Sequence, residues 1–233
     1  MLELSRIRAI TLDLDDTLWP VMPTIERAEA VLQAWLAEHA PATARHLSHA
    51  DTRRAVRAQV NRELAHLAHD FTALRRAAIR LALQQAGDDP AHAEPAFEVF
   101  FAERQRVDFF ADALPALGAL AARFPLVSVS NGNADIHRVG IGQHFRAQVS
   151  AREVGVAKPD PRIYHVAAQR AGVPPEQVLH IGDDAALDVL GALQAGMQTV
   201  WLNRDGQPWA HGPQQRPHCT VADLWALCAQ LGL

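Results

Sequence analysis

Short apolar runs that end in polar residues recur along the chain and predict the strands of a sheet. The first run, residues 9–15, contains apolar and β-branched side chains and stops at a group of aspartates. Later runs cover residues 125–131, 177–183 and 199–204, and each follows a stretch with helical periodicity. Strands that alternate with helices are typical of a parallel sheet covered on both faces. The pattern therefore predicts an α/β fold built on a doubly wound, Rossmann-like parallel sheet.

The pattern changes between residues 20 and 108, where it becomes typical of helices. Ala, Leu, Arg, Gln, Glu and His dominate this stretch, and strand-like runs almost disappear. Because these residues favour helices, we expect helices here and no strands. The expected helices cover residues 24–39, residues 49–86 with a break, and residues 91–106.

This helical stretch interrupts the α/β pattern and predicts two domains. The core domain would be discontinuous, formed by residues 1–19 and 109–233, and an all-helical cap domain would span residues 20–108. Such a cap would sit over the carboxyl edge of the sheet, where parallel sheets bind their ligands. The segment of residues 205–218, rich in Gly, Pro and Gln, predicts a surface loop before a final short strand and helix.

Composition and charge exclude several classes of protein. With 233 residues, 49% of them hydrophobic, the chain can bury a substantial core. A net charge of −4 offers no basic surface for a nucleic-acid backbone, so no nucleic-acid partner is expected. The chain shows no signal peptide and no apolar run long enough to cross a membrane, which predicts a cytoplasmic protein without a membrane partner. Cys219 and Cys228 lack the spacing of a metal site.

The first strand run ends in the acidic stretch "DLDDTL". Asp13 and Asp15 lie two residues apart, so both side chains would point to the same side of a regular strand. Two carboxylates in one small volume suit a nucleophile beside a general acid or base, or a magnesium site. A solvated strand end with turn-forming aspartates is the alternative that this motif alone leaves open.

A second acidic cluster lies in the stretch "HIGDDAALDVLGALQAGM", residues 180–197. Asp183 is expected at the end of a strand, and Asp184 and Asp188 lie four residues apart on the helix expected to follow. Helix capping would explain Asp184 alone. It does not explain Asp183 and Asp188, which the predicted fold brings to the same sheet edge as the first cluster. Carboxylates from separate loops suit Mg²⁺, which binds through few carboxylates and a substrate phosphate.

Two stretches between the acidic clusters offer groups that bind anions. In "VSVSNGN", Ser130 ends a strand run, and Asn131 and Gly132 follow in a loop whose backbone N–H groups could face an anion. Lys158 precedes "PDP", a pattern typical of a helix start, and therefore lies just outside a helix. Strand-end serines are common turn formers and single lysines are mostly solvated. Beside several carboxylates and a phosphate, however, Lys158 would neutralise charge.

In order, "DLDDTL", Ser130 at a strand end, "KPDP" and "GDDAALD" resemble the four motifs of the haloacid dehalogenase-like (HAD) hydrolase superfamily. The resemblance covers essentially the whole chain and is to the phosphatase branch with a helical C1-type cap after the first motif. Each motif is short, but four in the correct order are specific. The stretches "SNGN" and "KPDPRIY" are most similar to a subgroup that contains bacterial phosphatases of a ribitylaminouracil phosphate.

The resemblance implies a Mg²⁺-dependent phosphatase that hydrolyses a small-molecule phosphate monoester through an aspartyl-phosphate. Asp13 would attack phosphorus, and Asp15 would protonate the leaving group and then activate water. Lys158 and Ser130 would hold phosphate oxygens, with Asn131 and Gly132 beside them. The resemblance also implies a set of groups around Mg²⁺, in which Asp188 acts through water or Lys158: Asp13, the backbone carbonyl of Asp15, Asp183 and Asp188.

Several alternatives remain at the level of sequence. A phosphomutase would keep both Asp13 and Asp15, whereas a hydrolytic dehalogenase of the same fold would not use the second aspartate as an acid or base. A non-catalytic phosphate-binding or signalling protein is a rival of another class, disfavoured because all the acidic positions and Lys158 are present. The sequence leaves open the ester, the oligomeric state, the part of Asp184 at the metal, and whether Trp19 packs on substrate or braces the chain.

Overall fold

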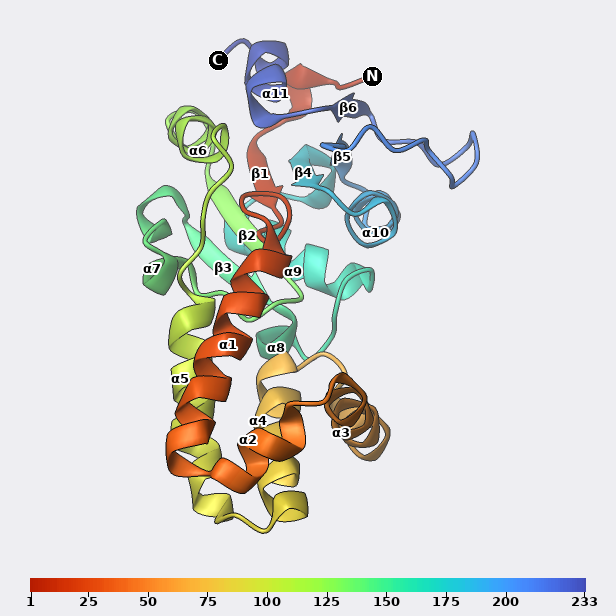
Figure 1. Ribbon diagram of the computed structural model, residues 1–233. Coiled ribbons are helices and arrows are strands. Elements are labelled where there is room, and N and C mark those ends of the chain that lie inside the picture. The colour runs from red at the N-terminus through yellow and green to blue at the C-terminus, as the bar shows by residue number, and fades with distance from the viewer. The chain divides into compact units, whose positions relative to one another are not determined.

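The computed structural model describes residues 1–233, which divide into two compact units (Figure 1). One unit comprises Met1–Pro20 and Asp108–Leu233, and the other comprises Val21–Val107. The first unit contains a parallel sheet, and the second is built from helices alone. No helix of either unit is both long and apolar enough to cross a membrane.

The sheet of the first unit has six parallel strands in the order β3-β2-β1-β4-β5-β6. Their bounds are β1 Ala9–Leu12, β2 Leu126–Ser130, β3 Ala147–Ser150, β4 Val178–Gly182, β5 Gln198–Leu202 and β6 Cys219–Val221. The order runs outward in both directions from β1, which pairs with β2 on one side and β4 on the other. Ligands of open α/β sheets bind where the strand order reverses in this way. The carboxyl end of β1 is therefore the place to look for a site.

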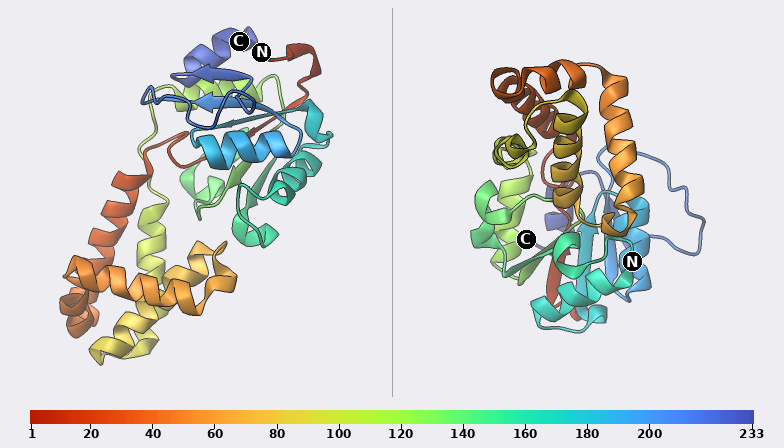
Figure 2. Two further views of the ribbon diagram at one scale, coloured as in Figure 1. Left: turned by 90° about the vertical axis from the view of Figure 1, so that its right-hand side faces the viewer. Right: turned by 90° about the horizontal axis from the view of Figure 1, so that it is seen from below.

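Helices cover both faces of the sheet, which confirms the predicted doubly wound fold. Figure 2 shows α6 and α11 on one side and α9 and α10 on the other. The helices of this unit are α6 Ala113–Ala121, α7 Ile136–Val139, α8 Ala151–Val154, α9 Pro161–Ala171, α10 Gly191–Gln194 and α11 Leu224–Leu231, with short 3-10 turns at Leu4–Arg6, Gly142–His144 and Pro175–Gln177. Apolar residues of α9 and α10 pack with those of the central strands, as Ile163 and Ala192 do.

Strand β3 is the element of the sheet that the apolar pattern did not predict. It has the sequence AQVS, and only one of its four residues is fully buried. An edge strand pairs on one side only and needs no continuous apolar run. The four predicted apolar runs correspond to β1, β2, β4 and β5. The predicted final strand and helix correspond to β6 and α11.

The helical unit has its own apolar core. Its elements are α1 Val21–His39, α2 Pro41–Leu47, α3 Ala50–Glu63, α4 Phe71–Ala86 and α5 Ala93–Arg104, with 3-10 turns at Ala65–Leu67 and Pro90–His92. Leu32, Leu36, Leu83 and Phe97 are among the residues that pack at its centre. The expected break within residues 49–86 falls between α3 and α4, where the Asp70 side chain accepts a hydrogen bond from the backbone N–H of Ala73 and caps α4.

Candidate active site

The first acidic stretch forms a tight loop directly after β1. The backbone N–H of Asp13 donates to the carbonyl of Ile181 at 2.9 Å, so pairing with β4 continues one residue past the strand. Asp16 has a positive φ of 58°, which an aspartate tolerates, and its N–H donates to the Trp19 carbonyl at 2.8 Å. The loop thus turns back on itself and leaves the Asp13 carboxylate at the carboxyl end of the central strand.

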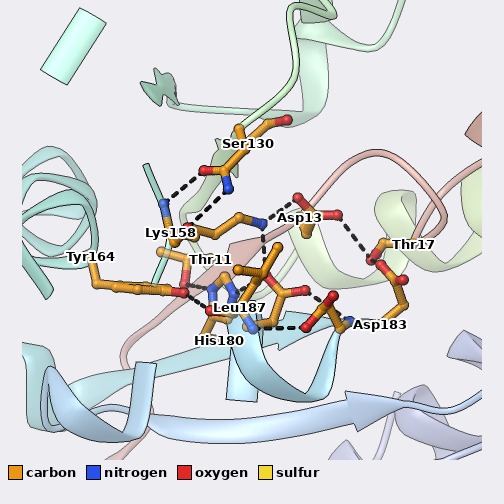
Figure 3. A network of polar contacts seen from close by, with 12 residues as sticks. Thr11, Asp13, Thr17, Ser130, Lys158, Tyr164, His180, Asp183 and Leu187 are labelled. Carbon is orange, nitrogen blue, oxygen red and sulfur yellow. Dashed lines mark hydrogen bonds and ion pairs between the residues drawn. The ribbon is translucent and has the colours of Figure 1, made fainter. Parts of the chain in front are cut away.

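Asp13 and Lys158 form a buried ion pair at this edge. Lys158 Nζ lies 2.5 Å from Asp13 Oδ1 and 2.7 Å from Asp188 Oδ1, and Figure 3 shows the lysine reaching Asp13 from the neighbouring loop. The side chains of Lys158 and Asp13 are only 3% and 9% exposed. An ammonium buried to this extent needs anionic partners, and here one lysine serves two carboxylates.

The side chain of Asn131 fixes the backbone of Lys158. Asn131 Oδ1 accepts a hydrogen bond from the Lys158 N–H at 2.7 Å, and Asn131 Nδ2 donates to the Lys158 carbonyl at 3.1 Å. These two bonds join segments that are 27 residues apart in the chain. The Asn131 amide, expected near the phosphate, therefore contacts the lysine backbone.

Ser130 and Gly132 form a local turn beside this pair of bonds. Ser130 is 1% exposed and ends β2, and its Oγ accepts a hydrogen bond from the Gly132 N–H at 2.9 Å. That backbone N–H, expected to face an anion, already has a partner in the protein. The Ser130 hydroxyl keeps its own proton for donation, because it acts as the acceptor in this contact.

Asp188 is held by several partners at once. Its Oδ1 accepts from Lys158 Nζ and lies 3.1 Å from His180 Nε2, and its Oδ2 accepts from the Asp184 N–H at 3.0 Å. The carboxylate lies directly over Gly182, where a Cβ atom would be 2.2 Å from Asp188 Cγ. Only glycine leaves room for the carboxylate at this point of β4. Most of the acceptor capacity of Asp188 is used within the protein.

The segment that carries Asp188 is not the regular α-helix that the spacing of the acids suggested. Asp184 accepts hydrogen bonds from the N–H groups of Ala186 and Leu187, both at 2.8 Å, and caps a π-helical turn over Ala185–Leu190 that leads into α10. Wide turns of this kind occur often at functional sites. The Asp184 side chain is thereby engaged as a cap, while its backbone N–H supports Asp188.

Asp183 lies on the other side of Asp13 and has hydroxyl and backbone partners but no ion pair with a lysine. Its Oδ1 accepts a hydrogen bond from the Thr17 hydroxyl at 3.0 Å, and its backbone carbonyl accepts from Trp201 Nε1 at 2.8 Å. The Thr17 hydroxyl is also 3.5 Å from Asp13 Oδ2. Thr17 thus links the loop after β1 to the end of β4.

The pKa values of the three carboxylates are shifted in different directions. Burial raises the pKa of Asp13 well above its ordinary value, because the opposing effect of Lys158 is smaller. Burial and the nearby Asp188 raise the pKa of Asp183 to about 7. Burial would also raise the pKa of Asp188, but Lys158 and His180 outweigh it and lower the pKa to about 2. Asp13 and Asp188 together hold the pKa of Lys158 above its ordinary value, against burial.

Three carboxylates, two of them buried and that of Asp183 half-buried, could hold a cation together. One oxygen from each of Asp13, Asp183 and Asp188 lies within 4.8 Å of the others. An all-oxygen donor set suits Mg²⁺. The raised pKa values of Asp13 and Asp183 indicate negative charge that the protein itself does not balance. The donor set therefore fits Mg²⁺; Asp13 and Asp183 have oxygens that could bind it directly, whereas Asp188 is already bound to Lys158.

Asp15 does not join these three carboxylates. Its Oδ1 accepts a hydrogen bond from Trp19 Nε1 at 2.8 Å. Trp19 is fully buried and packs edge-on against Phe109, with ring centroids 5.6 Å apart. Strand β1 ends at Leu12, so the rule that alternate residues share a face no longer applies to Asp13 and Asp15. Trp19 orients Asp15 and braces the loop, which answers the question that the sequence left open.

A pocket of about 490 Å³ lies next to the acidic cluster in the first unit. It is lined by Asp183, Asp16, Phe110 and the segment after β5, including Trp201, Asn203 and Arg204. Arg204 is anchored there, since its Nη2 donates to the Thr17 carbonyl at 2.9 Å and its Nη1 lies 3.1 Å from Asp112 Oδ2. The pocket gives small molecules a route to Asp183.

Reasoning from the sequence missed four side chains of this network: Thr11, Thr17, Trp19 in its contact with Asp15, and His180. Thr11 and His180 were read only as members of strand runs. Their polarity within otherwise apolar strands is a signal that could have singled them out.

Comparison with known proteins places this site in a family. The family model for haloacid dehalogenase-like hydrolases matches residues 7–196, which include every residue of the site described above except the pocket residues that follow α10. The chain belongs to the haloacid dehalogenase-like hydrolases. The family resemblance noted in the sequence is therefore confirmed.

Proteins similar to this chain include two that match nearly its whole length and one that matches about two thirds of it. The 5-amino-6-(5-phospho-D-ribitylamino)uracil phosphatase YigB of Escherichia coli (strain K12) is 34% identical over 96% of each chain. A phosphoserine phosphatase of Thermus thermophilus is 35% identical over 64% of this chain and 62% of its own length. The crystal structure of a 2-haloacid dehalogenase from Pseudomonas syringae pv. Tomato DC3000 matches with a TM-score of 0.90 and 36% identity, covering 97% of this chain and 98% of that one. The relatives thus include phosphatases and a dehalogenase.

Proposed function

We propose that this hydrolase is a Mg²⁺-dependent phosphatase that hydrolyses a small-molecule phosphate monoester through an aspartyl-phosphate. The observation that carries the proposal is the buried Asp13–Lys158 pair at the carboxyl end of the central strand, with Asp183 and Asp188 beside it. A carboxylate nucleophile, a cationic side chain for phosphate oxygens and carboxylates for a cation are the groups that phosphoryl transfer needs.

In the first half of the reaction, an Asp13 carboxylate oxygen attacks phosphorus. A bond forms between that oxygen and phosphorus while the bond from phosphorus to the ester oxygen breaks. The leaving oxygen takes a proton from the Asp15 carboxyl, which Trp19 orients by its hydrogen bond. Lys158 stabilises the negative charge on the phosphoryl oxygens, and the Ser130 hydroxyl donates to one of them.

In the second half, water hydrolyses the aspartyl-phosphate. Asp15, now a carboxylate, takes a proton from the water molecule as its oxygen bonds to phosphorus, and the bond from phosphorus to Asp13 breaks. Inorganic phosphate leaves and Asp13 is restored. Asn131 holds Lys158 in place by its two bonds to the lysine backbone throughout both steps.

Asp13 and Asp183 would hold Mg²⁺, with the backbone carbonyl of Asp15 as the further ligand that the resemblance implies. The ion would supply positive charge to the phosphoryl oxygens and keep Asp13 ionised at neutral pH. Burial raises the pKa of Asp13 despite the opposing effect of Lys158, and a bound cation would lower it.

A hydrolytic dehalogenase is the second candidate, because of the similarity to the crystal structure of a 2-haloacid dehalogenase. Two features of the site favour the phosphatase. Asp15 is present and held by Trp19, although displacement of halide needs no acid at that position. Asp183 adds a half-buried carboxylate whose charge suits a cation, and a dianionic phosphate needs that cation more than a monoanionic haloacid does.

The relatives favour small phosphate esters as substrates, since the names of both phosphatases specify such compounds. The test is release of inorganic phosphate from a panel that includes 5-amino-6-(5-phospho-D-ribitylamino)uracil and phosphoserine, with and without Mg²⁺. A parallel assay follows halide release from 2-haloacids. Asp13→Asn is the test variant, and Asp135→Asn, which keeps the cap of α7, is the matched control.

We expect Mg²⁺-dependent release of phosphate that Asp13→Asn abolishes and Asp135→Asn leaves intact. Halide release without phosphate release would replace the phosphatase by the dehalogenase. Absence of both, in folded protein with Mg²⁺, would overturn the hydrolase mechanism as proposed.

A further inference from the structure

A polar pair lies inside the sheet beneath the site. Thr11 on β1 and His180 on β4 are register neighbours, and both side chains are fully buried. They lie on the same face of the sheet as Ala9 and Val178, which belong to the apolar core. Buried polar groups are costly in such surroundings unless each is hydrogen-bonded. We therefore looked for a role of the Thr11–His180 pair other than packing.

The hydrogen bonds of the pair lead to the site. Thr11 Oγ1 lies 2.8 Å from His180 Nδ1, and His180 Nε2 lies 3.1 Å from Asp188 Oδ1. A carboxylate only accepts hydrogen bonds, so the imidazole carries its proton on Nε2 and donates to Asp188. Nδ1 is then an acceptor, and the Thr11 hydroxyl donates to it. Every polar atom of the imidazole has a partner of the correct kind.

The imidazole is also held from the side. The Tyr164 ring meets it edge-on, with centroids 5.1 Å apart and planes at 88°, and the Tyr164 hydroxyl donates to the Leu187 carbonyl. Gly191 allows this contact, because a Cβ there would be 2.6 Å from the Tyr164 oxygen. The ring therefore has little freedom to rotate away from Asp188.

Asp188 connects the restrained His180 ring to Lys158. The same oxygen, Asp188 Oδ1, contacts both His180 Nε2 and Lys158 Nζ, and Lys158 in turn contacts Asp13. Figure 3 shows Thr11, His180 and Lys158 in one continuous network below Asp13. The chain of contacts runs from the interior of the sheet to the proposed nucleophile.

We propose that Thr11 and His180 are positioning residues, which fix the Asp188 carboxylate from below and through it the position of Lys158 against Asp13. The inference rests on the proposed function for its effect on turnover, and on the geometry alone for the state of the imidazole. Outer partners of this kind change activity by about 10- to 100-fold when they are removed from metal sites.

The first experiment reads the imidazole directly in the free wild-type protein. ¹⁵N NMR of the histidine ring nitrogens should show His180 protonated on Nε2, with Nδ1 as a hydrogen-bond acceptor. In Thr11→Val the Nδ1 resonance should move toward the value of a lone pair without a hydrogen bond, and Thr11→Ser should restore it. A ring protonated on Nδ1, or on both nitrogens, would overturn the proposed arrangement.

The second experiment separates positioning from packing. The double variant Thr11→Val, His180→Phe replaces the Thr11–His180 pair by apolar groups of similar shape, while Asp188 keeps Lys158 and the Asp184 N–H, so the variant should fold with a small loss of stability. We nevertheless expect kcat to fall by about 10- to 100-fold with little change in KM, because Lys158 is no longer fixed. Thr11→Ser should recover most of the turnover that Thr11→Val loses.

Thr199→Val is the matched control. Thr199 is fully buried and is the register neighbour of His180 on β5, but its hydroxyl lies 3.5 Å from His218. It should keep wild-type turnover. A stable double variant as fast as the wild type would overturn the positioning role. If the wild type itself shows no turnover, the proposed phosphatase fails instead, and the ring-nitrogen spectra still decide the arrangement of Thr11 and His180.

Discussion

The two sides of the acidic cluster are built differently. On one side, Lys158 pairs with Asp13 and Asp188 at 2.5 and 2.7 Å, and all three side chains are almost completely buried. On the other side, Asp183 has the Thr17 hydroxyl and the neighbouring Asp13, and no lysine or arginine is paired with it. Burial raises the pKa of Asp183 to about 7, whereas Lys158 and His180 overcome burial and lower that of Asp188 to about 2.

The protein supplies its own positive charge on the Lys158 side, whereas on the Asp183 side we expect a bound cation to supply it. On the Lys158 side, one ammonium group serves two carboxylates and, with His180, lowers the pKa of Asp188, so substitutions there should mainly reduce folding stability. On the Asp183 side, the ionised carboxylate is energetically unfavourable, and a bound cation would stabilise it. Substitutions on the two sides should therefore have different signatures: loss of stability on the first, loss of cation response on the second.

The largest effect is expected for Lys158→Met. The variant leaves two buried carboxylates without their cation, and removal of one partner of a buried ion pair costs about 3–5 kcal/mol of unfolding free energy. Denaturant unfolding at pH 8 and pH 5 measures it. The loss should shrink at the lower pH, because Asp13 can then take up a proton. An equal loss at both pH values would show that charge is not the cause.

A smaller effect, at most a few kcal/mol, is expected for Asp183→Asn, and it should depend on pH. Because folding raises the pKa of Asp183 from its ordinary 3.8 to about 7, the folded state holds this proton more tightly than the unfolded state. Without metal, the wild type should match the variant near pH 4, lose stability relative to it as the pH rises to 7, and stay lower above pH 7.

Added Mg²⁺ should reverse that order. Thermal unfolding above pH 7 with Mg²⁺ should show stabilisation of the wild type and none of Asp183→Asn, because a ligand that binds only the folded state stabilises it. If the two proteins respond equally to Mg²⁺, Asp183 is not a ligand of the cation.

Asn131→Ala tests how Lys158 is held, with an expected loss of about 1–3 kcal/mol. The variant removes both hydrogen bonds to the Lys158 backbone, so kcat should fall more than KM rises. Asn203→Ala is the matched control, since Asn203 makes the same two bonds to Gln207 in an exposed loop, at 2.8 and 2.9 Å. Denaturant unfolding of the two variants compares them. Equal losses would mean that the bonds of Asn131 matter no more than those of a surface turn.

The smallest effect is expected for Asp184→Asn, at less than about 1 kcal/mol. Asparagine can still accept the hydrogen bonds from Ala186 and Leu187, and the backbone N–H to Asp188 is unchanged. The Mg²⁺ dependence of turnover should remain that of the wild type. A weaker response to Mg²⁺ would place Asp184 among the metal ligands and extend the Asp183 side by one carboxylate.

Strand-end motifs allowed much of the site to be predicted. The fold class follows from the alternation of runs and helices, and the meeting of Asp13, Asp183 and Asp188 follows from the carboxyl ends of neighbouring parallel strands. The helix start after Lys158 placed it only in a loop, and the resemblance to the hydrolase family placed it beside Asp13. Local pattern and the general geometry of a parallel sheet were enough for the carboxylates alone.

The supporting contacts could not be predicted in the same way. That Thr11 lies opposite His180 depends on the register of β1 against β4, which no local pattern specifies. The bond between Asp15 and Trp19 depends on the end of β1 at Leu12, and the short edge strand β3 has too few buried residues to stand out. Asn131 was assigned to the anion because its partner, a backbone amide, leaves no mark in the sequence.

The central place of β1 has a consequence for synthesis of the chain. Its partners in the sheet begin at Leu126 and Val178, and Lys158 follows Asp13 by 145 residues. The helical unit, residues 21–107, is one continuous stretch with its own apolar core and leaves the ribosome before either partner strand. The first acidic motif must therefore wait, unpaired, until most of the polypeptide has been made. Non-local pairing of this kind slows folding, and it keeps the reactive centre unassembled in any product that terminates before Lys158.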